Sequence, residues 1–406
     1  MSKNTNSFGN PVFGQLLSLL PKTQIASVID KFRANKYAKK LKTLDHLKVM
    51  LFAVFSNSSG LREIQSGVAG FHTKLLHLGL EWLPKKSTLS DANAKRSADV
   101  FEAIFQTIYK HFKPYLPDSY PKNQQWMQKL FLVDSTTITL FRNILKACGR
   151  TPANGKRKGG VKIHVGMHLS ESTPSLVRVT SAATNDKKFM TKFRDIEAGT
   201  ILVFDKAYIH YELYNHWTNN QVTFVTRLNK RSNVEVIQEF CVAEEEKQEG
   251  VLAIKEVELG HPNQKERVKC RLIECYDQSK ERYLTFITND MNMPGSQIAE
   301  IYKQRWQIEL LFKRLKQNLQ LSDFLGDNEN AVRIQIWCNL IADLLLTVIR
   351  KGAKLKRAYS NVAGLVRLHL MNYVDVNELL NNPGDISIFE NNKIEYNLEL
   401  NLHPPS

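Results

Sequence analysis

Two apolar runs of the sequence each end in an aspartate. Residues 130–133 (Leu-Phe-Leu-Val) precede Asp134, and residues 201–204 (Ile-Leu-Val-Phe) precede Asp205. Four apolar residues in a row are typical of a strand that is buried on both faces. An aspartate directly after such a strand lies at the edge of the sheet, where ligand sites form. If the two strands are parallel neighbours, both carboxylates can lie at the same edge.

A later segment carries polar side chains at helical spacing: Tyr302, Arg305, Glu309 and Lys316. At about 100° per residue, these four share one narrow stripe of a helix over about four turns. A glutamate from this stripe, together with Asp134 and Asp205, would form a three-carboxylate pocket for a divalent metal ion. The cations and the hydroxyl beside it suit the phosphates of a phosphodiester substrate.

Each of these features also has a structural explanation. An aspartate after a strand often serves a turn or a helix cap, and the residues Ser135-Thr136-Thr137 after Asp134 suit a turn. The stripe could equally be the solvated face of an amphipathic helix with internal ion pairs. Taken one at a time, these explanations are favoured. The combination, in this order along the chain, favours a catalytic site.

The composition favours an anionic partner. The 406 residues are 43% hydrophobic, with a formal net charge of +16 at pH 7 and a pI near 9.5. Residues 1–120 contain 17 Lys and Arg against 8 Asp and Glu, and residues 121–240 contain 18 against 9. The remainder contains 21 against 23. A basic enzyme without a nucleic-acid partner is the alternative, but a phosphodiester site in so basic a chain favours nucleic acid.

Cysteine spacing and hydropathy bear on metal content and location. The five cysteines are scattered, which argues against a structural zinc site and fits reduced thiols in a cytosolic protein. The N-terminus lacks an apolar signal core. Residues 334–349 are apolar but interrupted by Gln335, Asn339 and Asp343, and they are predicted to be too short to span a bilayer. We expect a buried helix there, no membrane partner and a cytoplasmic location.

The apolar pattern divides the chain into five parts. Residues 1–120 are predicted to be a helical DNA-binding domain, with a helix-turn-helix outline around residues 56–60 and one helix from Ser87 or Thr88 to about residue 108. Residues 121–227 give three strands, helix, strand, helix, strand, the order of a ribonuclease-H-like α/β core. Residues 228–290 are predicted to be a β-rich insertion. Residues 291–350 complete the core with the Glu309 helix, and residues 351–406 form a helical C-terminal region with a polar tail.

The sequence resembles the DDE transposases of bacterial insertion sequences, in the insertion-sequence-four group. In that family the first aspartate lies in a Val-Asp-Ser-Thr-Thr-Ile context, as in residues 133–138. The second is followed by an aromatic residue three positions on, here Tyr208, although Ala207 stands where relatives often have glycine. The third motif, Y-x2-R-x3-E-x6-K, is matched from Tyr302 to Lys316. Residues 87–93 also resemble a stretch ahead of the catalytic domain, and the likeness spans about residues 10–350.

The resemblance implies two Mg²⁺ or Mn²⁺ ions held by Asp134, Asp205 and Glu309. They would support DNA cleavage and strand transfer in cut-and-paste transposition. In several relatives the excised DNA end passes through a hairpin. The side chains expected to contact DNA phosphates are Tyr302, Arg305, Lys316, Lys156, Arg157, Lys158 and Lys162. For the last four, a solvated basic loop is an equally good explanation. His164 and Trp306 are expected to be packing residues. The partner implied is double-stranded DNA, at transposon ends and target, bound by a homodimer in the bacterial cytoplasm and nucleoid.

Two other functions stay open from the sequence. A metal-dependent nuclease or junction resolvase on the same fold would cleave DNA without strand transfer. A domesticated, non-catalytic DNA-binding protein would bind DNA without cleaving it, although the complete set of three carboxylates argues against this.

Overall fold

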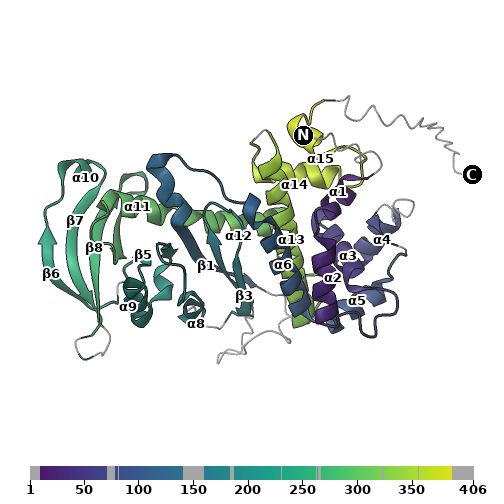
Figure 1. The fold of residues 1–406 in the computed structure, drawn as a ribbon, viewed down its shortest axis with the longest axis horizontal. Helices are drawn as coiled ribbons and strands as arrows, with labels where there is room; N and C mark the ends of the chain where they lie inside the picture. Colours follow the sequence, from purple (N-terminus) through teal and green to yellow (C-terminus); the bar gives the residue numbers. More distant parts are fainter. Residues whose placement is uncertain are drawn as a thin grey trace, which may run out of the picture.

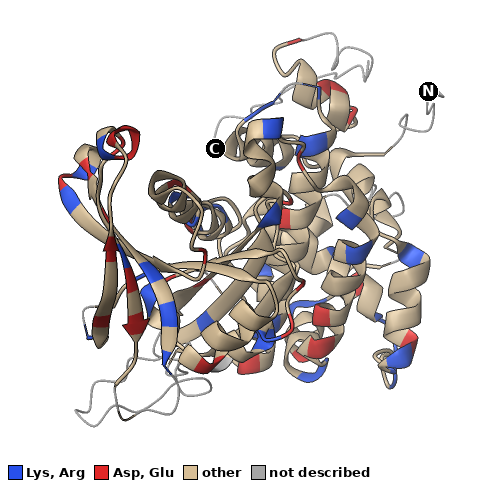
Figure 2. Cartoon of the chain, turned by 60° about the vertical axis from the view of Figure 1, so that its left-hand side comes forward, with Lys and Arg blue, Asp and Glu red and all other residues tan. Residues whose placement is uncertain are grey.

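The computed structural model describes residues 10–70, 78–80, 82–139, 160–182, 187–229, 231–261, 263, 267–321, 324–354 and 356–385. The fold is α/β. A twisted sheet with helices on its faces lies beside a bundle of helices, and the bundle is built from both ends of the chain (Figure 1). Lys and Arg are spread over both regions (Figure 2).

Within the described residues the sheet has nine strands, in the order β3-β2-β1-β4-β5-β9-β8-β7-β6. The strands are β1 (Leu130–Thr139), β2 (Gly160–His168), β3 (Leu176–Ser181), β4 (Ile201–Phe204), β5 (Thr223–Arg227), β6 (Val234–Phe240), β7 (Val251–Leu259), β8 (Val268–Asp277) and β9 (Arg282–Thr288). β4 is parallel to both β1 and β5. The other neighbours are antiparallel.

The central strands are buried on both faces, as the apolar runs predicted. In β1, Leu130 and Leu132 belong to one hydrophobic cluster, whereas Phe131 and Val133 belong to a second one on the other face. This alternation follows from the two-residue period of a strand. Helix α12 (Trp306–Asn318) contributes to the first cluster and α9 (Tyr211–Asn219) to the second. The even-numbered side chains of β1 therefore share a face with α12.

The predicted β-rich insertion is an extension of the central sheet. Three of its strands lie within a residue of the segments expected from the sequence, 251–259, 267–276 and 283–288. The last of them, β9, pairs antiparallel with β5, Val225 opposite Thr288, so β9 to β6 continue the sheet outward. Neither β6 nor this pairing was predicted from the sequence. Pairing with an exposed strand edge satisfies backbone groups that β5 would otherwise present to solvent.

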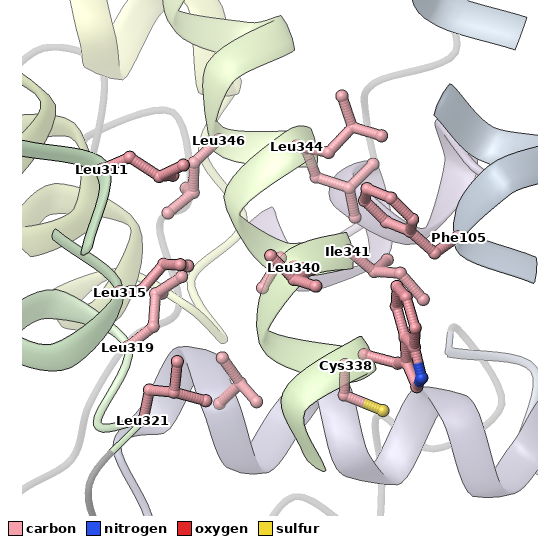
Figure 3. Close-up of a cluster of buried hydrophobic side chains, with 14 of the residues drawn as sticks. Phe105, Leu311, Leu315, Leu319, Leu321, Cys338, Leu340, Ile341, Leu344 and Leu346 are labelled. Atoms are coloured by element: carbon pink, nitrogen blue, oxygen red, sulfur yellow. The ribbon is translucent and has the colours of Figure 1, made fainter. Parts of the chain in front are cut away.

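The helical bundle surrounds one long helix, α13 (Glu329–Gly352). The helices of the bundle are α1 (Val12–Ser18), α2 (Lys22–Lys31), α3 (Thr43–Ser56), α4 (Leu61–Gly70), α5 (Lys86–Lys95), α6 (Ala98–Phe112), α14 (Tyr359–Leu368) and α15 (Val376–Asn381). Figure 3 shows Phe105 of α6 on one side of α13 and Leu311 and Leu315 of α12 on the other. α13, assigned by sequence to the catalytic part, thus forms a core shared with the N-terminal helices.

The prediction that residues 334–349 form a buried helix is confirmed, but the helix is longer than expected. α13 has 24 residues, because it extends beyond residues 334–349 to Glu329 at one end and Gly352 at the other, so the prediction of a segment too short to span a bilayer is wrong. Among the described residues, length and composition alone would let α13, or the bent pair α1 and α2 together, cross a membrane. In α13, 83% of that apolar window is buried inside the protein.

The N-terminal helices agree with the sequence except at one break. α1 and α2 are separated at Pro21. α3 ends at Ser56 and is followed by Asn57, whose φ of 55° is a left-handed conformation that asparagine tolerates. The single helix predicted after Ser87 is wrong, because α5 ends at Lys95 and α6 begins at Ala98. Ser97 lies between them and accepts a hydrogen bond from Asp99 N, which caps α6 and stops the preceding helix.

Candidate active site

The two aspartates follow matched positions on parallel neighbouring strands. β1 and β4 pair in register up to Val133 opposite Phe204, and each aspartate is the next residue. The predicted parallel pairing is therefore confirmed. One detail differs: β1 continues past Asp134 to Thr139, because β2 pairs with it on the other side. Asp134 thus lies where β4 stops covering the edge of β1, on the face that α12 covers.

A backbone hydrogen bond orients each aspartate. Asp134 Oδ1 accepts from Ser135 N at 2.8 Å. Asp205 Oδ1 accepts from Ala207 N at 3.1 Å and so caps the short 3-10 helix η7 (Lys206–Tyr208). The turn and cap roles considered from the sequence are therefore present. They fix the directions of the two carboxylates at the sheet edge.

The segment that carries the third motif is two helices with a tight turn between them. α11 (Gly295–Lys303) ends before Gln304, and α12 begins at Trp306. Across the break, Arg305 N donates to Tyr302 O at 3.0 Å and Ile308 N donates to Arg305 O at 3.2 Å. These i→i−3 bonds tighten the helix, but Arg305 keeps helical φ and ψ of −53° and −27°. The prediction of one continuous helix from Tyr302 to Lys316 is therefore wrong.

Arg305 bridges two of the predicted carboxylates. Its Nη1 lies 2.5 Å from Asp134 Oδ2 and its Nη2 lies 2.5 Å from Glu309 Oε1. The side chains are 17% exposed for Arg305, 15% for Asp134 and 34% for Glu309. Burial acts to lower the pKa of Arg305, but Asp134, Tyr302 and Glu309 raise it overall. The guanidinium therefore remains charged between the two carboxylates.

The environment of Asp134 disfavours its ionised form. Burial raises its pKa from 3.8 to about 6, against the opposing effect of Arg305. The negative charges of Asp205 and Glu309 add to the rise. Carboxylates that repel one another in a partly buried site are stabilised either by a shared proton or by a bound cation. The site is thus short of positive charge even with Arg305 in it.

The three predicted ligands have the oxygen donors that a hard divalent cation prefers, but their side chains do not surround a metal position in this structure. All three predicted ligands offer carboxylate oxygens, which suit Mg²⁺ and Mn²⁺. Among the residues that the structure describes, no group of three His, Cys, Asp or Glu is gathered closely enough to hold a metal ion. Arg305 occupies the space between Asp134 and Glu309. The three-carboxylate metal site remains a prediction.

Lys316 and Tyr302 also lie beside this edge. Lys316 Nζ donates to Thr136 Oγ1 at 2.7 Å, and burial lowers the pKa of Lys316. The ring of Tyr302 is 5.7 Å from the Arg305 guanidinium. Burial raises the pKa of Tyr302, and the charge of Asp205 adds to this. The motif thus lies against β1 and within electrostatic reach of Asp205.

The other predicted residues are placed less directly. Lys156, Arg157 and Lys158 lie outside the described residues. Lys162 on β2 is opposite Thr137, on the face of the sheet away from Asp134. His164 is fully buried against Phe189, ring centroids 4.7 Å apart, which confirms the packing role.

Trp306 does not have its predicted packing role. Its side chain is 53% exposed, and Lys280 Nζ lies 5.9 Å from its ring. Trp306 begins α12, whose buried residues start at Ile308, so its side chain leaves the apolar stripe.

Residues 125–345 match the family described as Transposase DDE domain, over a span that contains both aspartates and the whole third motif. This span is more than half of the 406 residues. The chain belongs to the DDE transposase family. It is therefore an enzyme that acts on DNA, and the family implies a divalent metal ion. Residues 8–81 match a second family, described as a domain of unknown function (DUF4372).

Bacterial relatives of this transposase bear transposase names. A protein of Sinorhizobium fredii (strain NBRC 101917 / NGR234) that is named as a transposase is 31% identical over 277 residues, which are 68% of this chain and 73% of the relative. One for an insertion sequence element of Geobacillus stearothermophilus is 28% identical over 226 residues, 55% and 58% of the two chains. The cryo-EM structure of a piggyBac transposase synaptic complex with hairpin DNA matches with a TM-score of 0.45 and 8% identity. It covers 97% of this chain and 84% of that one, and a likeness this weak carries no argument.

Two residues beside the candidate site were missed from the sequence. Thr136 was assigned to a turn, but it lies two residues after Asp134 in the same strand and so on the same face. Arg227 ends β5, and its charge acts to lower the pKa of Tyr302. A signal for Arg227 was available: it directly follows the predicted strand 222–226, as Asp205 follows the strand 201–204.

A buried ion pair anchors the helix that carries Glu309 and Lys316. Arg314 of α12 donates from Nη2 to Asp343 Oδ2 of α13 at 2.8 Å and to Ser172 O at 2.5 Å. Its guanidinium also lies 4.8 Å from the ring centre of Tyr359 in α14. Asp343 is fully buried and Arg314 is 14% exposed. This contact fixes α12 of the transposase against the helical bundle.

Proposed function

We propose that the transposase cuts an insertion sequence out of double-stranded DNA and joins its ends to a target, with Asp134, Asp205 and Glu309 as ligands of two Mg²⁺ or Mn²⁺ ions. The observation that carries this proposal is the double contact of Arg305 with Asp134 and Glu309. One cation already bridges these two carboxylates, and Asp205 lies at the matched end of the neighbouring strand. Excision through a DNA hairpin is part of the proposal.

The catalytic core proposed is ribonuclease-H-like. Its support is the strand order β3-β2-β1-β4-β5, in which three antiparallel strands are followed by two that run parallel to β1. Residues 1–120 are proposed as a DNA-binding domain. The N-terminal helices pack on α13, so this domain is physically joined to the catalytic part. We also propose a homodimer on DNA in the cytoplasm, associated with the nucleoid when bound.

Divalent ions, when bound, would activate the attacking hydroxyl and stabilise the leaving oxygen. The residues of the transposase then divide into two kinds. Asp134, Asp205 and Glu309 offer only oxygen acceptors, so they are proposed as the metal ligands. Arg305, Lys316 and Tyr302 offer donors, so they are proposed to bind DNA phosphates once Arg305 is released from its carboxylates. Lys156, Arg157, Lys158 and Lys162 are proposed to contact the DNA backbone away from the site.

The test uses linear DNA that carries the ends of the element, with full-length transposase and Mg²⁺. The proposal expects cleavage at the ends, a hairpin product on a denaturing gel and joining of the ends to a target plasmid. Cleavage without joining would show the nuclease alternative instead. DNA binding without cleavage would show the non-catalytic alternative.

The affinity of the transposase for Mn²⁺ should fall as the pH drops below about 6. The pKa of Asp134 is raised to about 6, and a carboxylate must lose its proton to ligate a metal ion. Below that pH, each further unit should cost about tenfold in affinity, because one proton competes with the metal. Calorimetric titration with Mn²⁺ from about pH 5 to about pH 8 measures this. An affinity that stays constant over this range would remove Asp134 from the ligand set.

A further inference from the structure

A groove of about 930 Å³ lies in the N-terminal helical region, between the loop after α2 and the segment that contains α5. Residues 32–41 form one wall, and residues 82–100 contribute the other. None of the residues of the candidate active site lines it. The first wall belongs to the part of the chain that matches a domain of unknown function.

The groove is strongly basic. Apart from Lys95, five of its lining cations are exposed: Arg33, Lys36, Lys39, Lys40 and Lys85. Within the described part of the chain, none of these five forms an ion pair. The one acidic side chain among the lining residues, Asp91, is 3.2 Å from Lys95 and so is already neutralised. A concave surface lined by one sign of charge concentrates ligands of the opposite sign.

The basic wall is held in a fixed conformation. Its loop makes two left-handed turns, at Arg33 (φ 50°) and Tyr37 (φ 63°). Asn35 Oδ1 accepts from Thr43 N at 2.8 Å and from Thr43 Oγ1 at 2.9 Å, which ties the loop to the start of α3. The lysines therefore extend from an ordered backbone, and little loop ordering is left for a ligand to impose.

A chain of buried polar groups ties the far end of the loop to α5. Arg96 donates from Nη2 to Leu41 O at 2.7 Å, and its Nη1 lies 2.9 Å from His46 Nδ1. Burial lowers the pKa of His46 to about 3, so its ring is neutral and Nδ1 can accept from Arg96. His46 Nε2 then meets Asn93 Oδ1 at 2.8 Å. Arg96 is thus a structural residue of the groove, unlike the five exposed cations.

Aromatic side chains stand among the cations. Tyr37 is 89% exposed and Phe32 is 43% exposed, and Trp82 also lines the groove. Lys36 Nζ lies 4.9 Å from the Tyr37 ring centre. Exposed aromatic rings within a basic groove suit the sugars and bases of nucleic acid, which offer flat apolar surfaces between charged phosphates. An anionic membrane surface would not enter a groove.

We propose that this groove binds the phosphodiester backbone of double-stranded DNA, at a distance along the chain from the catalytic residues. The proposal rests on the proposed function, since it takes the partner to be the DNA on which the transposase acts. Arg33, Lys36, Lys39, Lys40 and Lys85 contact phosphates, and Tyr37 packs on the sugars between them. The groove thereby gives the domain of unknown function a role in holding DNA for the catalytic domain.

The test replaces three loop lysines in the full-length protein, Lys36→Ala, Lys39→Ala and Lys40→Ala together. The matched control removes the same charge from exposed positions outside the groove, Lys22→Ala, Lys110→Ala and Lys122→Ala. Binding to an end-containing duplex is measured by fluorescence anisotropy over a range of salt concentrations. Each lost phosphate contact should reduce the slope of log affinity against log salt by about 0.9. The groove variant should therefore lose about tenfold or more in affinity at low salt and two to three units of slope.

A rescue variant with arginine at the same three positions should bind as the wild type does, because the charge is restored. Equal affinity and slope in the groove variant and the control would overturn the proposal, as would a loss confined to single-stranded DNA. Metal-dependent nicking, measured at saturating protein, distinguishes a failure of the groove proposal from a failure of the proposed function. If wild type and groove variant both nick DNA and bind it equally well, the groove assignment fails and the transposase function stands. If neither protein nicks DNA, the proposed function fails.

Discussion

Replacing Asp205 with asparagine in the full-length transposase should lower the rate of metal-dependent DNA cleavage by at least about a thousandfold. Asparagine keeps the size of the side chain and its bond to Ala207 N, but it removes the charge that a divalent ion needs. Asp134→Asn and Glu309→Gln should have the same effect, because each removes one of three proposed carboxylate ligands. The rate of single-strand nicking on labelled end DNA, with Mg²⁺ and saturating protein, measures this loss.

Two kinds of control accompany these variants. Glu244→Gln removes a carboxylate from an exposed pair with Lys247, away from the candidate site and the basic groove, and should leave the nicking rate unchanged. Arg305→Ala and Lys316→Ala should weaken complex assembly and hairpin formation, with some first-strand nicking surviving. DNA binding should persist in all three carboxylate variants. Full nicking by any one of them would exclude that residue as a ligand. Complete loss of nicking in Arg305→Ala and Lys316→Ala would show that the proposed division of roles is wrong.

Asp343→Ala should destabilise the transposase by about 3–5 kcal/mol. The substitution leaves Arg314 as a charge that is 14% exposed and has lost its carboxylate partner. Removal of one partner of a buried pair costs far more than the pair itself contributes, because the remaining charge stays desolvated. The free energy of unfolding, from urea denaturation of wild type and variant, measures the difference.

The matched control is Asp91→Ala, whose partner Lys95 is exposed. This control should lower the free energy of unfolding by less than about 1 kcal/mol. A double variant, Arg314→Met with Asp343→Leu, should recover much of the stability, since no charge is left buried. If Asp343→Ala and Asp91→Ala destabilise equally, the Arg314–Asp343 pair does not anchor α12. Loss of this anchor should also reduce nicking, because α12 carries Glu309.

The positions of Asp134 and Asp205 could be predicted because burial on both faces leaves a simple trace in the sequence. A run of four apolar residues marks a central strand, and the residue after it lies at the edge. The insertion strands β7, β8 and β9 were predicted from β-rich segments with few helical signals. Their attachment to β5 could not be predicted, because strand pairing depends on backbone groups that every residue type carries alike.

The contacts of Arg305 show where a helical wheel stops being informative. The wheel placed Tyr302, Arg305, Glu309 and Lys316 on one stripe, but it gives directions around an axis and no distances across to the sheet. The break at Gln304 and Arg305 was invisible for a related reason: both residues keep helical dihedral angles, and only the hydrogen-bond pattern changes. Trp306 was misplaced because a large apolar side chain next to a buried stripe is usually part of it.

The most direct test of the three-carboxylate site is a crystal structure of the transposase with end DNA and Mn²⁺, in which anomalous scattering locates the metal. The structure should show Mn²⁺ bound by oxygens of Asp134, Asp205 and Glu309, with two ions about 3.5–4 Å apart. Arg305 should have left Asp134 and Glu309 for a DNA phosphate. Anomalous peaks at other residues, or Arg305 still bridging Asp134 and Glu309 beside a correctly placed DNA end, would contradict the account.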